Sequence, residues 1–211
     1  MSDTPLPPAL HSAPALVSIL AGYAVLGCLL LAGAVVIADV VVPDHDWVSD
    51  TISDLGAGRY EFIADAGLYA FSTALVCIAI LAAHVHLGGR GWSFGIVAFA
   101  LMGLIVFLVG ARNEYGDSDN EGVVIHIYLV YALGVLMALA PWAMAQSAGQ
   151  MGRGYTRLLR AIAVLWVLTA PVFFFLPTGI DGLYERGLGL LAIIAVCTLA
   201  HLFLRYGRAL R

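Results

Sequence analysis

Six long apolar runs alternate with short polar connections along the 211 residues of this chain. A helix needs about 20 mostly apolar residues to cross a bilayer. Six segments reach that length, and none shows the alternating pattern of a barrel strand. They are Leu16–Val41, Phe62–Leu87, Trp92–Ala111, Val123–Ala145, Leu158–Pro177 and Gly187–Tyr206. The pattern predicts an all-α fold, a bundle of six transmembrane helices.

The spans fill almost the whole chain and leave no room for a soluble domain. We expect a short N-terminal tail over residues 1–15, a single transmembrane domain over 16–207 and a basic tail over 208–211. The first run is too long for a signal peptide and has no basic segment before it, so it is expected to remain uncleaved. Pro171 should bend the fifth helix, because it lacks a backbone N–H.

The arginines predict how the bundle is oriented. Cytoplasmic connections carry an excess of basic residues, and seven of the ten arginines lie on alternate connections or near the C-terminus: Arg90, Arg153, Arg157, Arg160, Arg205, Arg208 and Arg211. Both termini are therefore expected in the cytoplasm of a cell with this protein in its inner membrane. The loops 42–61, 112–122 and 178–186 then lie outside, together with thirteen of the fourteen carboxylates.

Composition strengthens the membrane assignment and excludes several function classes. The chain is 62% hydrophobic and 11% charged, with a mean hydropathy of +0.95, whereas about a quarter of the residues of a soluble domain are charged. Three cysteines in separate apolar runs do not form a disulfide framework. No phosphate loop, dinucleotide fingerprint or Gly-x-Ser-x-Gly elbow is present, and no nucleic-acid partner is expected.

The longest outer loop, VVPDHDWVSDTISDLGAG, has two interpretations. Its Ser, Thr and Asp residues favour caps and turns, so they would cap a short interfacial helix while Trp47 contacts lipid headgroups. Alternatively, Asp50 and Asp54 stand one helical turn apart and would form a paired carboxylate site for a cation or a substrate.

Carboxylates close to the helices need partners. Asp65 is expected inside the second helix, where an unpaired charge is costly, and Arg112 and Arg186 are the available cations at the outer helix ends. A guanidinium pairs well with a carboxylate, so the pairs would lock helix ends, or would handle protons or bind substrate. Arg112, Arg186 and Trp47 are also the candidates for contact with lipid headgroups.

The histidines suggest further chemistry. His126, just inside the fourth helix, either bonds to a carboxylate or carbonyl, or takes part in acid–base or metal chemistry, since imidazole titrates near neutrality. His45 and His126 with Asp54 are the candidates for a divalent metal, although no His-x-x-x-His spacing supports one. Beyond this candidate metal, no cofactor is predicted. His201, alone among apolar neighbours, should hydrogen-bond to a facing helix.

Three motifs resemble a known family. The motifs are VSDTISDLGAG before the second helix, VVIHIYLVYA at the fourth and GLYERGLG at the sixth. Together they resemble the prokaryotic membrane family called domain of unknown function 998. The resemblance implies six spans with the motifs on one side, and it singles out Ser53, Asp54, Leu55, Gly56, His126, Glu185 and Arg186. The residues GARNEYGDSDN depart from the family's Gly-x-Phe-Pro-Glu segment.

Three functions are open on these observations. The first is a non-catalytic accessory or assembly subunit, or a lipid-contacting module, with membrane lipids and a larger membrane complex as partners. Its polar network would comprise Ser53, Asp54, Asp65, His126, Glu185 and Arg186. The second is an interfacial lipid hydrolase or transferase, metal-dependent or not, that uses Asp50, Asp54, His126 and Glu185. The third is a small-solute or ion-coupled transporter. The location of the charges at helix ends argues against it.

Overall fold

A computed structural model describes residues 13–56, 58–111, 125–177 and 179–209. Its elements are α1 (Pro14–Val41), α2 (Ile52–Leu55), α3 (Glu61–His84), α4 (Arg90–Ala111), α5 (His126–Ala148), the 3₁₀ turn η1 (Gly149–Met151), α6 (Arg153–Thr169), the 3₁₀ segment η2 (Ala170–Phe175) and α7 (Asp181–Ala209). Six of these helical segments are long and apolar enough to cross a membrane. The predicted all-α bundle of six spans is confirmed, and the protein is a multi-pass membrane protein.

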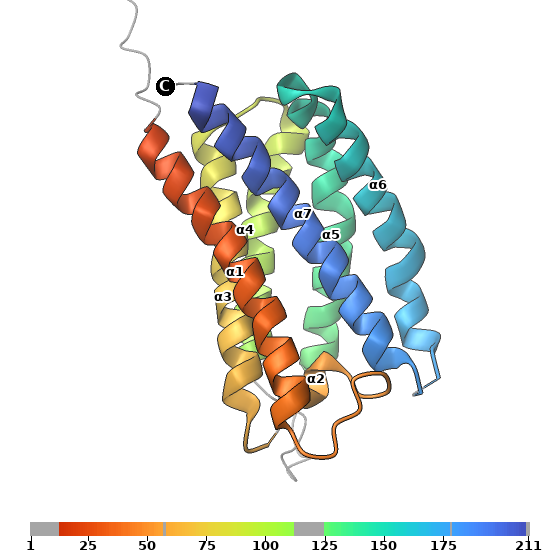
Figure 1. Cartoon of the computed structure of the whole chain (residues 1–211). Coiled ribbons are helices and arrows are strands. Elements are labelled where there is room, and N and C mark those ends of the chain that lie inside the picture. The colour runs from red at the N-terminus through yellow and green to blue at the C-terminus, as the bar shows by residue number, and fades with distance from the viewer. Residues whose placement is uncertain (1–12, 57, 112–124, 178, 210–211) are drawn as a thin grey trace, which may run out of the picture.

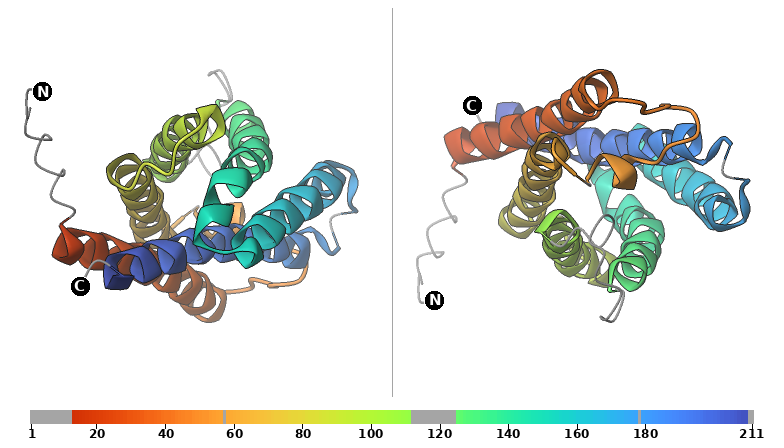
Figure 2. Two further views of the ribbon diagram at one scale, coloured as in Figure 1. Left: turned by 90° about the horizontal axis from the view of Figure 1, so that it is seen from above. Right: turned by 90° about the horizontal axis from the view of Figure 1, so that it is seen from below.

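The spans run side by side (Figure 1) and form a closed ring rather than a row. Consecutive spans pack side by side, and the ring closes where α7 packs against α1. Both views along the bundle show this arrangement, with α6 on the outside beside α5 and α7 (Figure 2). Since consecutive spans alternate in direction, the polar connections gather at two ends. We call these the acidic end (residues 39–65, the start of α5 and the start of α7) and the basic end (84–92, 146–160 and 201–209).

Small residues allow the closest helix contacts. Gly27 of α1 lies so near α3 that a methyl group there would overlap the carbonyl oxygen of Ala70, and Gly67 of α3 lies equally close to Ala34 of α1. Lipid tails are as apolar as the helices, so packing and hydrogen bonds hold such bundles together. Small side chains therefore determine how closely these helices approach each other.

Polar groups inside the bundle are satisfied by neighbouring helices. The Trp92 indole donates to the Ala82 carbonyl (2.8 Å), Ser72 to Gly103 (2.7 Å) and the Trp166 indole to Gly134 (2.9 Å). His201 lies 3.0 Å from the Tyr155 hydroxyl of α6, which confirms its predicted bond to a facing helix. Such partners are needed where no water is available.

Several helix boundaries differ from the predicted spans. α6 begins at Arg153 instead of Leu158, and α7 begins at Asp181 instead of Gly187. Each helix continues through polar residues at the membrane boundary, which a search for apolar runs leaves out. At Pro171, where a bend was predicted, the α-helix stops: α6 ends at Thr169 and the chain goes on as the 3₁₀ segment η2.

Candidate functional site

The loop between α1 and α3 folds into a compact structure at the acidic end. Thr51 and Asp54 form a capping box around α2: the Thr51 hydroxyl accepts from the Asp54 N–H, and the Asp54 carboxylate accepts from the Thr51 N–H at 2.7 Å. The expected short helix is therefore present, and Thr51 and Asp54 cap it. Leu55, fully buried, packs with Val35, Ala38 and Ala64. This contact holds α2 against the ends of α1 and α3 (Figure 2).

Arg186 of α7 is the centre of the site. Its Nη2 and Nε donate to the two carboxylate oxygens of Asp39 at 2.5 and 3.3 Å, a bidentate pair. Its Nη1 donates to the backbone carbonyls of Asp50 (2.8 Å) and Gly182 (2.9 Å). The Arg186 and Asp39 side chains are only 14% and 18% exposed. The guanidinium thus joins the end of α1, the loop and α7.

His45 completes this arrangement. Its Nε2 lies 3.1 Å from both Arg186 Nη2 and Asp39 Oδ1, and its Nδ1 lies 3.5 Å from Asp50 Oδ2. The imidazole side chain is 3% exposed. A neutral ring protonated on Nδ1 accepts from Arg186 and faces Asp50, whereas a protonated ring faces both carboxylates as a donor. Both ring nitrogens are therefore engaged by neighbouring side chains.

A second set of contacts ties the loop to the first turns of α7. The Glu185 carboxylate accepts from the backbone N–H of Ile52 at 2.6 Å, at the start of α2. The Leu183 N–H donates to the Val48 carbonyl at 3.0 Å. Gly182 lies against the backbone of Asp50, where any side chain would overlap the Asp50 carbonyl oxygen. The loop and α7 thus meet backbone to backbone, which requires glycine at position 182.

The carboxylates of Asp50 and Asp54 bond to different groups of the loop and are not arranged around one ligand. The Asp50 carboxylate accepts from the Asp46 N–H (2.8 Å) and the Ser49 hydroxyl (3.1 Å), while that of Asp54 is used in the capping box. The Asp46 N–H, with smaller contributions from Ser49, His45 and Arg186, lowers the pKa of Asp50 below its usual 3.8. Asp50 is therefore an ionised part of the loop structure.

The other predicted residues that the structure describes lie at the same end of the bundle. His126 is the first residue of α5 and is buried, and Asp65 lies in the second turn of α3, as expected. Trp47 is 54% exposed on the loop. Ser53 lies in α2. Arg112 lies outside the described residues.

The carboxylate partner of Arg186 is the residue that sequence reasoning did not single out. Asp65 was the predicted carboxylate near the helices for Arg186, whereas the structure pairs Arg186 with Asp39. A usable signal was present, because Asp39 stands in an apolar run next to three valines and a carboxylate there needs a cation. The sequence distance of 147 residues between the two partners hid the pairing.

The residues at this site do not form a typical metal centre. Across the described residues, no group of three or more His, Cys, Asp or Glu side chains is placed to hold a metal ion. His45, one of the candidate ligands, has the Arg186 guanidinium 3.1 Å from its Nε2, and that positive charge disfavours a divalent cation at the same nitrogen.

Comparison with known proteins assigns the family. The family model described as protein of unknown function (DUF998) matches residues 25–202. The chain belongs to this family. No curated protein and no solved structure matches the chain.

The structure of this DUF998 protein brings together two of the motifs that carried the resemblance. VSDTISDLGAG contributes the Asp50 carbonyl and the Ile52 N–H, and GLYERGLG contributes Gly182, Glu185 and Arg186. They are separated by more than 120 residues in sequence. Chemically, the arrangement fixes a loop: each charged group bonds to the loop backbone or to another member of the site.

Proposed function

We propose that this DUF998 protein is a non-catalytic membrane subunit that presents a rigid acidic loop, residues 42–60, to another membrane protein. The observation that carries the proposal is that Arg186 and Glu185 both bond to the backbone of the loop, while Arg186 also pairs with Asp39. A catalytic group needs a free reactive atom aimed at a substrate. These two side chains instead hold the loop in one conformation.

The loop has a surface suited to such a partner. Trp47 and the carboxylates of Asp44, Asp46 and Asp54 are exposed on it, and an aromatic side chain surrounded by charges is typical of a binding hot spot. A partner with basic residues near the membrane surface would match this charge. We place the acidic end outside the cytoplasm, as the arginine distribution indicates.

The test is photo-crosslinking in native membranes. A photoreactive amino acid at position 47 should capture one membrane protein, which should also co-purify in mild detergent in a fixed ratio. The variant Asp44→Asn should reduce this capture, while Arg153→Gln at the basic end should leave it unchanged. Asn suits position 44, because the φ angle there is +58° and Asn tolerates that region.

Other outcomes would contradict the proposal. If the purified protein is a monomer without a partner and converts an added lipid, and if Glu185→Gln abolishes that conversion without unfolding the protein, then the hydrolase or transferase interpretation is correct. Purification with mass spectrometry of lipids and proteins distinguishes the two results.

A further inference from the structure

A pocket of about 510 Å³ opens between α5 and α6 at the basic end, far from the Arg186 site. It is lined by Gln146, Gly149, Gln150, Arg153, Thr156, Arg157 and Arg160. Three of these seven residues are arginines and none is acidic. The carboxylates of the described residues all lie at the acidic end, so none of them is a counter-ion for these arginines.

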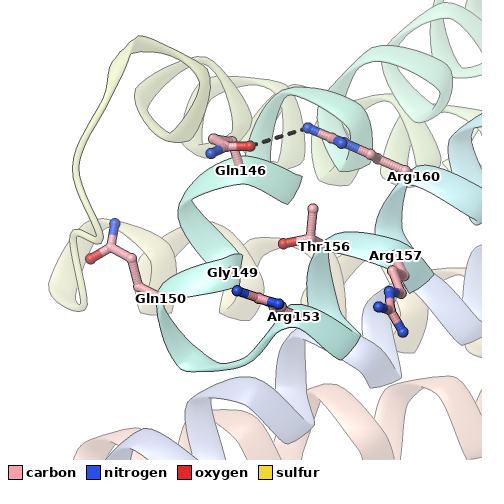
Figure 3. Close-up of a pocket in the computed structure, with 7 residues that line it drawn as sticks. All are labelled: Gln146, Gly149, Gln150, Arg153, Thr156, Arg157 and Arg160. Carbon is pink, nitrogen blue, oxygen red and sulfur yellow. Dashed lines mark hydrogen bonds between the residues drawn. The ribbon is translucent and has the colours of Figure 1, made fainter.

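Two of the arginines are aimed at the pocket. Figure 3 shows Arg153 and Arg160 extending from α6 toward the turn between α5 and α6, on either side of Thr156, whereas Arg157 points away from Gln146. Arg160 donates to the Gln146 side chain at 3.1 Å. No ion pair of the described residues includes any of these arginines. Their charge is therefore available to a ligand.

The floor and wall of the pocket are polar and fixed. Thr156 is half-buried, and its hydroxyl enters no hydrogen bond among those found in the described parts of the chain. The wall is anchored to the α3–α4 connection, since the Gln150 amide donates to the Leu87 carbonyl (2.6 Å) and the Ser147 hydroxyl to Gly88 (2.7 Å). The Thr156 hydroxyl is a hydrogen-bond donor between two guanidinium groups, and such an arrangement suits a phosphate.

An apolar surface continues from the pocket along the bundle. Arg160 lies over the ring of Trp142, with its Cζ 5.6 Å from the ring centroid. Beyond it, Leu139 and Val135 of α5 follow Trp142 at one-turn spacing, and Val164 and Leu168 of α6 follow Arg160 in the same way. All five apolar side chains are exposed. Acyl chains would cover this surface while a headgroup occupied the pocket.

We propose that this pocket is a binding site for an anionic phospholipid. The phosphodiester would be held by Arg153, Arg160 and the Thr156 hydroxyl, and the acyl chains would lie along α5 and α6. Basic pockets between transmembrane helices recognise anionic headgroups in this way. The site is independent of the proposed function, because it lies at the other end of the bundle and uses none of the same residues.

The experiment is native mass spectrometry of the full-length protein in detergent, titrated with phosphatidylglycerol or with phosphatidylcholine. The wild-type protein should retain one phosphatidylglycerol with about tenfold preference, since charged hydrogen bonds distinguish the two lipids. The double variant R153Q/R160Q should lose that preference. The matched control R205Q/R208Q removes two arginines at the same end, outside the pocket, and should keep it.

Three results would overturn the proposal. The first is equal retention of both lipids by the wild-type protein, and the second is an equal loss of preference in both double variants, which would indicate a general effect of surface charge. The third is displacement of the lipid by excess inorganic phosphate, which would indicate a site for the free anion. If R153Q/R160Q does not fold, R153K/R160K and T156V replace it. The lysine variant should keep the preference in part, and T156V should weaken it.

Discussion

The guanidinium of Arg186 connects three segments that are distant in sequence: the end of α1, the loop and the first turn of α7. Its side chain is 14% exposed, so its partners would remain largely without water if it were removed. The loss of one member of such a buried pair leaves the other charge uncompensated. The stability of the acidic end therefore depends on this residue more than on any solvent-exposed charge.

Arg186→Ala should lower the stability of the purified protein by about 3 kcal/mol and reduce its folded yield. Arg153→Ala is the control, because Arg153 is exposed and has no ion pair among the described residues. Thermal unfolding in detergent and the yield of monodisperse protein measure the effect. Equal losses in both variants would contradict the assigned role of Arg186.

Gly182→Ala tests the backbone contact between α7 and the loop. The added methyl would overlap the Asp50 carbonyl oxygen, and overpacking of this kind costs about 2 kcal/mol. Gly187→Ala, in the same helix, meets nothing within 4 Å and should be neutral or stabilising by about 0.5 kcal/mol. The thermal unfolding midpoint of Gly182→Ala should therefore fall, while that of Gly187→Ala should stay unchanged or rise slightly.

The pH dependence of stability should show the contribution of Asp50. Its pKa is lower in the folded protein than its usual 3.8, mainly because the Asp46 N–H donates to it. A lowered pKa stabilises the folded state above the unfolded-state pKa, and this contribution disappears as the pH falls through the folded-state value. Asp50→Asn should therefore unfold at a lower temperature than wild type near pH 7, and the difference should shrink at about pH 3.

At the scale of elements, α1 and α3 form the most extensively packed pair in the bundle, and Gly27 and Gly67 let the two backbones approach. α6 packs less extensively: it lies against α5 and only partly against α7, at the outside of the ring (Figures 1 and 2). Its 3₁₀ segment at Pro171 leaves exposed aromatic residues such as Phe175 (86%). The bundle therefore has a tightly packed side and a more open side.

Gly27→Ala should destabilise the α1–α3 pair by about 2 kcal/mol, since the methyl would overlap the Ala70 carbonyl oxygen. Gly33→Ala lies in the same helix with nothing within 4 Å and provides the matched control. Hydrogen exchange of α1 and α3 should increase only in the first variant. If both variants behave like wild type, the close contact is not needed for packing.

At the scale of the whole molecule, charge is separated between the two ends of the bundle. The acidic end holds every carboxylate of the described residues, and the basic end holds all of their arginines except Arg59 and Arg186. These two lie at the acidic end, and Arg186 is paired there with Asp39. We expect this separation to match the positive-inside rule.

Orientation can be measured by labelling single cysteines in a variant without the three native ones. Trp47→Cys, in the exposed loop, should react with a membrane-impermeant maleimide in intact cells. Gly154→Cys, at the exposed start of α6, should react only after the membrane is opened. The reverse result would place the acidic end in the cytoplasm and would remove the proposed extracytoplasmic partner.

Much of this architecture follows from the sequence alone. Local patterns predict the number of spans, their approximate positions and the separation of charge, because burial in lipid requires uninterrupted apolar helices. The cap of α2 by Thr51 and Asp54 is also local. The pairing of Arg186 with Asp39, the contact of Glu185 with the Ile52 N–H and the pocket between α5 and α6 were decided by the tertiary structure. Each depends on which helices become neighbours in a closed ring, and hydropathy carries no information about that order.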